Sequence, residues 1–160
     1  MKPLSHEQNP VIDWSLQRTW SEVAVGDTLP PLRFPLTVYR MVMAAGANRD
    51  FNAIHHNTAH AQSTGAPEMY ANVMFLQGMW ERTVREYIGL AGTLHAIRGF
   101  RMRSFNTAGD TVVVQGRVER KWIDEAADAA QRHRLELKVW SENRHGVSVG
   151  PGVVEVSLPA

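Results

Sequence analysis

Residues 70–88 read YANVMFLQGMWERTVREYI and contain no proline. Apolar residues cover nearly the whole circumference of a helix as far as Trp80, and charged residues between 81 and 86 then open a polar face. This pattern predicts one long helix whose first half is buried. Such a helix needs a second layer to cover its apolar surface.

The segments around this helix predict that the second layer is a sheet. Residues 112–122 and 134–139 alternate apolar and polar side chains, which is typical of half-buried strands. Residues 93–105 and 153–158 complete four antiparallel strands joined by hairpins, with a turn at Ala108-Gly109-Asp110. Before the long helix we expect an edge strand at 34–39 and short helices at 41–47 and 58–64. The fold class is α+β, one long helix packed on a curved antiparallel sheet.

The chain has 160 residues, which favours a single domain. Residues 1–31 contain four prolines and two tryptophans and show no sustained period. We expect an irregular arm over 1–31, pinned by Trp14 and Trp20, on one domain over 32–160.

Composition excludes several classes of protein. The absence of cysteine rules out disulfide frameworks, thiolate zinc sites, iron–sulfur clusters and cysteine nucleophiles. The formal net charge of +1 gives no general attraction to nucleic acid or to anionic membranes. The first ten residues lack a secretory apolar core, and the longest nearly apolar stretch, 69–80, is too short to span a bilayer. We predict a cytoplasmic protein that binds neither nucleic acid nor membrane.

The most specific local pattern is D-x-N-x-x-H, formed by Asp50, Asn52 and His55 in a polar loop. If the loop turns, the carboxylate and imidazole can converge on one water and move its proton. The alternative is a loop that is merely hydrogen-bonded. A metal site using His56 and His60 with Asp50 or His55 is disfavoured, because no third spaced ligand supports it, so we predict no metal.

Two weaker features bear on ligands. The start of the long helix, near residues 70–74, offers free backbone N–H groups to a developing negative charge. Arg98, Arg101 and Arg103 would suit the phosphates of coenzyme A, but a solvated strand face is the favoured interpretation. Dinucleotide, nucleotide and serine-hydrolase motifs are absent from the sequence.

The polar loop, the short helix after it, Gly65-Ala66-Pro67, the long helix and the 105–114 stretch with Gly109-Asp110 occur in one order. This ordered set, over about residues 20–158, resembles the MaoC-like hydratase/dehydratase family of hotdog-fold proteins. The resemblance implies a long central helix wrapped by an antiparallel sheet. It also implies that Asp50 and His55 are catalytic, with Asn52 as the member between them on the substrate side.

The sequence departs from the family pattern at two places. Ala53 stands where the family usually has proline, which loosens the loop. Asn72-Val73 stands where the family usually has His-Gly. The resemblance then makes the Val73 amide the oxyanion donor, flanked by Asn72 and Met74 in the substrate-binding segment, and the valine side chain adds bulk there.

The activity that the resemblance implies is that of an (R)-specific enoyl-thioester hydratase or 3-hydroxyacyl-thioester dehydratase, a hydro-lyase. Water would add reversibly to a trans-2-enoyl-CoA, with coenzyme A present as part of the substrate and no redox cofactor or metal. Two alternatives stay open: a hotdog acyl-CoA thioesterase, and a non-catalytic hotdog partner subunit. The Met, Phe and Trp residues of the long helix fit either a roomy acyl pocket or ordinary core.

One helix and one sheet leave a strand edge and an apolar flank that a domain of this size covers with difficulty. We therefore expect a dimer, first a homodimer and second a heterodimer with another hotdog chain. The family resemblance adds that the ligand lies between the two protomers.

Overall fold

The computed structural model describes residue 9 and residues 11–160. The elements follow one another as β1 Thr28–Pro35, α1 Val38–Ala47, the short 3-10 helix η1 Ala53–His55, α2 Thr58–Ser63, α3 Val73–Ile88, β2 Thr93–Arg98, β3 Thr111–Ile123, β4 His133–Asn143 and β5 Gly146–Ser157. Among the described residues, no helix has the length and apolarity required to cross a bilayer.

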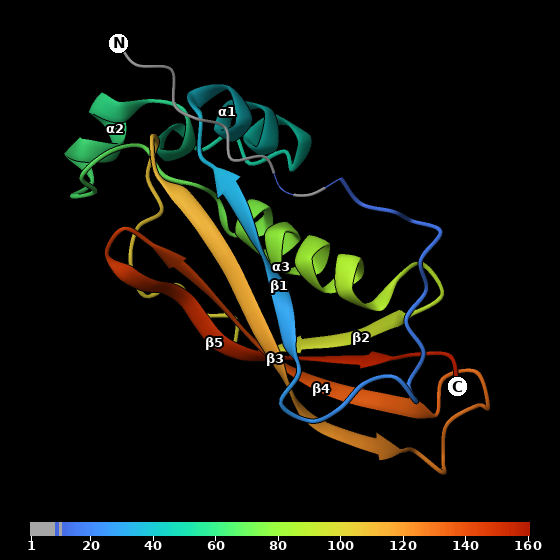
Figure 1. Cartoon of the computed structure of the whole chain (residues 1–160). Coiled ribbons are helices and arrows are strands. Elements are labelled where there is room, and N and C mark those ends of the chain that lie inside the picture. Colours follow the sequence, from blue (N-terminus) through green and yellow to red (C-terminus); the bar gives the residue numbers. More distant parts are fainter. Residues whose placement is uncertain (1–8, 10) are drawn as a thin grey trace.

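The strands form one antiparallel sheet in the order β1-β3-β4-β5-β2, and it curves around α3 (Figure 1). Trp80 of α3 is fully buried, and its indole N–H donates to Ser141 Oγ on β4 at 2.7 Å. Valines and leucines of alternate positions on β3, β4 and β5 surround it. The predicted α+β class and the hotdog arrangement of helix and sheet are confirmed.

The predicted hairpin between the strand after the long helix and the next strand is wrong. β2 ends at Arg98, where Gly99 adopts a positive φ of 68°, and β2 pairs with β5 at the opposite edge from β1. The turn at Gly109 instead pairs with the end of β1, through hydrogen bonds to and from Leu36 at 2.8 Å. The predicted turn at Ala108-Gly109-Asp110 is present, with Gly109 at a positive φ of 85°, but a turn motif does not specify which strand lies beside it.

The first strand begins earlier than expected, at Thr28 rather than residue 34, so the arm ends near residue 27. Pro30 and Pro31 fit within β1 because it is an edge strand, and the pairing with β3 shifts register between Leu29 and Leu32. Likewise α1 begins at Val38, where the Thr37 hydroxyl accepts from the Arg40 amide and caps the helix.

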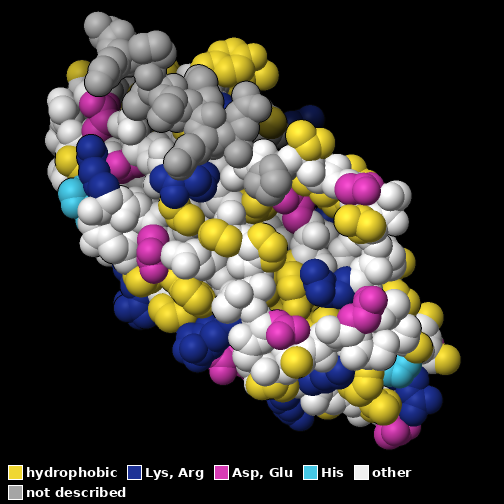
Figure 2. Space-filling model, viewed as in Figure 1, with side chains coloured by type: hydrophobic (Ala, Val, Ile, Leu, Met, Phe, Trp, Pro, Cys, Tyr) yellow, Lys and Arg dark blue, Asp and Glu magenta, His cyan; other side chains and the backbone are white. Residues whose placement is uncertain are grey.

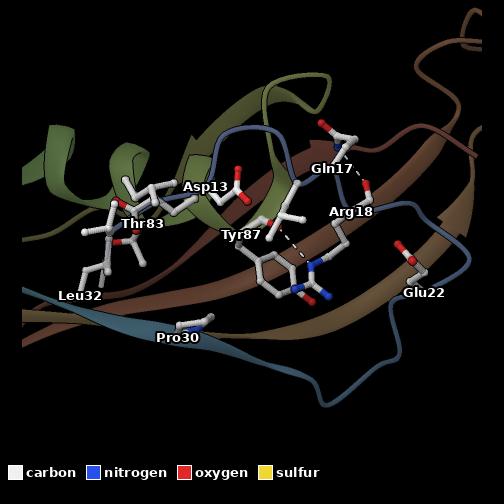
Figure 3. A pocket seen from close by; sticks show the side chains of 12 residues that line it. Asp13, Gln17, Arg18, Glu22, Pro30, Leu32, Thr83 and Tyr87 are labelled. Carbon is white, nitrogen blue, oxygen red and sulfur yellow. Dashed lines mark hydrogen bonds between the residues drawn. The ribbon is translucent and has the colours of Figure 1, made fainter. Parts of the chain in front are cut away.

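The described part of the arm is fixed to the domain by side chains on both sides. The indole N–H of Trp20 donates to the Arg134 carbonyl at 3.2 Å, whereas Trp14 is 41% exposed and its predicted anchoring role stays a prediction. Arg18 stacks on the ring of Tyr87 at 4.4 Å and its Nε donates to the Tyr87 carbonyl at 3.1 Å, beside a cavity of about 420 Å³ (Figure 3). Burial raises the pKa of the Tyr87 phenol. Residues 1–8 and 10 of the predicted arm lie outside the described residues.

Gln17 connects the arm to the end of α3. Its amide donates to the carbonyl of Ile88 at 2.7 Å and accepts from the amide of Ala91 at 2.8 Å. These bonds pair one carbonyl that the helix end leaves without an intrahelical partner.

We predict that Gln17→Ala lowers the free energy of unfolding by about 1–2 kcal/mol, because it leaves the Ile88 carbonyl and the Ala91 N–H without their hydrogen-bond partner. Urea titration followed by tryptophan fluorescence measures the change. Gln131→Ala, in the exposed 124–132 loop, is the matched control and should leave stability unchanged. Equal stability of the Gln17 and Gln131 variants would contradict the assigned role.

Candidate active site

Asp50 is positioned by the end of α1. Its backbone N–H donates to the Ala45 carbonyl at 2.9 Å and that of Arg49 donates to the Gly46 carbonyl at 3.1 Å, which together form a Schellman motif. Arg49 occupies the left-handed position of this motif, with φ 54°. The motif turns the chain sharply and directs Asp50 back toward the domain.

A second turn brings His55 to Asp50. The Asn52 side chain accepts from the Ile54 amide at 3.2 Å and caps η1, which ends at His55. His55 Nε2 then lies 3.0 Å from Asp50 Oδ2, with the imidazole side chain 9% exposed and the carboxylate 37% exposed. A buried imidazole and an accessible carboxylate thus meet at one point on the surface.

The hydrogen bonds of His55 determine where its protons lie. Nδ1 is 2.8 Å from the carbonyl oxygen of Tyr70, and a carbonyl only accepts, so Nδ1 carries hydrogen. Nε2 then faces a carboxylate oxygen, which also accepts when ionised. One proton must therefore lie between Nε2 and Oδ2, held by either His55 or Asp50. The pair can therefore accept and donate a proton, and the bond from Nδ1 to the Tyr70 carbonyl fixes the tautomer of His55.

The start of α3 lies beside this pair. Asn72 caps the helix by accepting from the Phe75 amide at 2.8 Å, and its side-chain oxygen also lies 3.4 Å from the Asn48 amide nitrogen. Among the described residues, the amides of Val73 and Met74 have no hydrogen-bond partner. These free N–H groups, at the positive end of a 16-residue helix, can stabilise a developing oxyanion.

A pocket of about 450 Å³ is lined by Tyr70, the residue whose carbonyl is bonded to His55, but not by Asp50 or His55 themselves. The Tyr70 ring packs edge-on against His55 at 5.4 Å and against Phe105 at 4.8 Å, and Met102 completes the apolar wall. Asn106, 2% exposed, also lines the pocket, and its Nδ2 has no hydrogen-bond partner among the described residues. Two other cavities, of about 420 Å³ and 780 Å³, lie at the arm and between β1, α1 and α3 respectively.

Comparison with known proteins identifies relatives of this chain, although no family model matches it. A curated relative, the 3-oxo-4,17-pregnadiene-20-carboxyl-CoA hydratase beta subunit of Mycobacterium tuberculosis, is 31% identical over 94 residues, 59% of this chain and 72% of the relative. A chain in the crystal structure of the ChsH1-ChsH2 complex from Mycobacterium tuberculosis superposes with a TM-score of 0.73 at 28% identity, covering 84% of this chain and 98% of that one. The chain belongs to the MaoC-like hydratase/dehydratase family.

The R-hydratase PhaJ1 from Pseudomonas aeruginosa shares the fold, with a TM-score of 0.76 at 19% identity over 88% of this chain and 85% of that chain.

The structure brings together some of the MaoC-like residues named from sequence and separates others. Asp50 and His55 are in contact, and Val73 begins α3 three residues after Tyr70, whose carbonyl is bonded to His55. Asn52 and Asn72 use their side-chain oxygens as helix caps, so neither oxygen is free for a substrate. Met74 is exposed at the start of α3. In the described part of the chain, no group of three His, Asp or Glu side chains is placed to hold a metal ion.

Other sequence alternatives are also resolved by the packing. Met79 and Trp80 are core residues and do not line a pocket. Arg98 is paired with Glu155 at 2.9 Å, and Arg103 Nε donates to the Gly150 carbonyl, which leaves Arg101 without a side-chain contact among the described residues. The contribution of Tyr70 was missed, because it acts through a backbone carbonyl 15 residues away from His55.

The left-handed position of Arg49 gives a direct test of how Asp50 is held. Glycine adopts this conformation without the steric cost that other residues incur, so Arg49→Gly should raise the free energy of unfolding by about 1 kcal/mol. Arg49→Ala also removes the side chain but keeps the cost, and it serves as the control. If urea titration finds the two variants equally stable, the Schellman geometry before Asp50 is wrong.

Proposed function

We propose that this MaoC-like protein is a hydro-lyase that adds water reversibly and (R)-specifically to a trans-2-enoyl-CoA, giving a 3-hydroxyacyl-CoA. The observation that carries the proposal is the Asp50–His55 pair beside the free amides at the start of α3. A general acid–base and an oxyanion donor are the two functions that this reaction requires. The curated relative supports the proposal, since it is named a hydratase subunit.

In the hydration direction, the substrate thioester oxygen would lie against the Val73 amide and the enoyl carbons over the pair. Asp50, the more exposed member, binds and orients the water. The pair takes one proton from this water as its oxygen bonds to C3, and the C2–C3 π electrons move onto the thioester as an enolate. The Val73 N–H stabilises that negative charge.

The enolate then collapses and C2 receives a proton from the pair, which returns to its starting state. Because the pair already holds one proton between Nε2 and Oδ2, it can accept and donate without a net change in charge over the cycle. His55 keeps its orientation throughout, since Nδ1 stays bonded to the Tyr70 carbonyl. The reverse sequence is dehydration.

We predict that Asp50→Asn and His55→Gln each lower kcat at least about 100-fold, the range expected for lost acid–base catalysis. Hydration is followed by loss of enoyl-thioester absorbance, and melting temperatures establish that both variants fold. His60→Gln changes a nearby, exposed histidine on α2 and should retain activity. Release of free thiol is measured in the same reactions, since hydrolysis of the thioester would favour a thioesterase, and full turnover by either variant would refute the assignment.

A non-catalytic role is a second alternative beside the thioesterase, and the intact pair argues against it. The partner itself is a separate question. The curated relative is named a beta subunit and the structural neighbour is a two-component complex. We propose that this chain pairs with a different hotdog chain along the free edge of β2, with a homodimer as the alternative.

Light scattering on the chain alone and after co-expression with a hotdog gene product encoded next to it tests this assembly. A heterodimer predicts that the pair co-elutes as one two-chain particle and that hydration requires both chains. A homodimer predicts about twice 17.9 kDa for the chain alone, with full activity. A monomer that stays fully active on dilution would contradict both assemblies.

A further inference from the structure

A groove of about 780 Å³ lies between β1, α1 and α3, outside the Asp50–His55 pair. Three arginines from three different elements line it, and we call it the arginine groove: Arg33 on β1, Arg40 on α1 and Arg82 on α3. Its apolar lining includes Phe34 and Phe75, which are half-buried.

One end of the arginine groove is formed by residues close in sequence to the candidate active site. Ala47, the last residue of α1, and Phe75, in the first turn of α3, both line the groove. Asp50 follows Ala47 by three residues and is bonded to α1, and Phe75 is bonded to the cap residue that precedes the oxyanion amides. The groove therefore runs along α1 away from the reacting atoms, over about 15 Å for a ten-residue helix.

The charge of the arginine groove is one-sided. Every charged residue in its described lining is an arginine. Arg40 Nη1 donates to the Pro35 carbonyl at 3.2 Å, and no carboxylate among the described residues pairs with Arg40, while Arg82 Nε is paired with Glu86 one turn along α3. Guanidinium groups bind phosphate and carboxylate oxygens through paired N–H donors.

Large apolar side chains of the groove are also exposed to solvent. Tyr39 is 73% exposed and Met43 55% exposed at its rim. Figure 2, seen from the same side as Figure 1, shows hydrophobic side chains interspersed with cationic and acidic ones over this face of the molecule. A ligand with an apolar body and an anionic group matches both properties.

We propose that the arginine groove binds an anionic group of the thioester ligand, through Arg40 and Arg82, while the reacting carbons lie at the Asp50–His55 pair. The inference rests on the proposed function, since that function places the thioester at the start of α3. Two sources of the anion share this chemistry: a phosphate of coenzyme A, and a carboxylate at the far end of the acyl chain.

Binding measurements by isothermal calorimetry separate the two sources without any turnover, using the protein in its native assembly. The first pair of probes is coenzyme A and pantetheine, which lacks the phosphates. The second pair consists of two saturated pantetheine thioesters of equal chain length, one ending in a carboxylate and one in a methyl group. Because none of these probes is hydrated, failure of the proposed reaction would not alter the readout.

We expect Arg40→Gln to weaken binding of one anionic probe at least about 10-fold and to leave its neutral counterpart unchanged. Arg82→Gln should act in the same direction, and Arg40→Lys should restore part of the affinity. Arg117→Gln is the control, since Arg117 lies on β3, is paired with Glu119 and does not line the groove. Loss confined to coenzyme A assigns the phosphate, and loss confined to the carboxylate probe assigns an acyl carboxylate.

The proposal is overturned if wild-type protein binds each anionic probe no more tightly than its neutral counterpart. It is also overturned if Arg40→Gln and Arg117→Gln have the same affinities. Melting temperatures of all variants establish that a loss of binding does not come from unfolding.

Discussion

Burial of α3 against the curved sheet is the constraint on which the active site depends. Trp80 fixes the depth of the helix through its contact with Ser141, and the valines of three strands close around it. The position of the helix start then follows, because a rigid 16-residue helix transmits its placement from one end to the other. Two backbone amides thus reach the surface at a defined point, and the polar loop is built around them.

The Asp50–His55 pair is assembled from backbone contacts more than from side-chain contacts. A Schellman motif positions Asp50, a capped 3-10 turn positions His55, and the Tyr70 carbonyl fixes the imidazole tautomer. Each of these is a local, directional constraint that tolerates substitution of neighbouring side chains. This explains how the loop retains its geometry with Ala53 in place of the family's usual proline and Arg49 in a left-handed conformation.

The sequence predicted the helix, the alternating strands and the turn requirement between Asp50 and His55, because each leaves a periodic or local signal. It did not predict that β2 lies beside β5, since strand order depends on long-range pairing that a turn at Gly109 does not encode. The Asn72 side-chain oxygen caps α3, a role that the sequence did not predict, and its Nδ2 has no hydrogen-bond partner among the described residues, so the assignment of Asn72 to the substrate stays a prediction. The sequence did not predict that the Tyr70 carbonyl binds His55, because every residue type has the same backbone carbonyl.

The central claim is that Nδ1 of His55 carries hydrogen toward Tyr70 and that one further proton lies between Nε2 and Asp50. Nitrogen-15 NMR of histidine-labelled protein measures this directly. The account predicts a protonated, hydrogen-bonded Nδ1 in both wild type and Asp50→Asn, with the signal of Nε2 changed in Asp50→Asn. An unprotonated Nδ1 with hydrogen on Nε2 alone, in the wild-type protein, would contradict it.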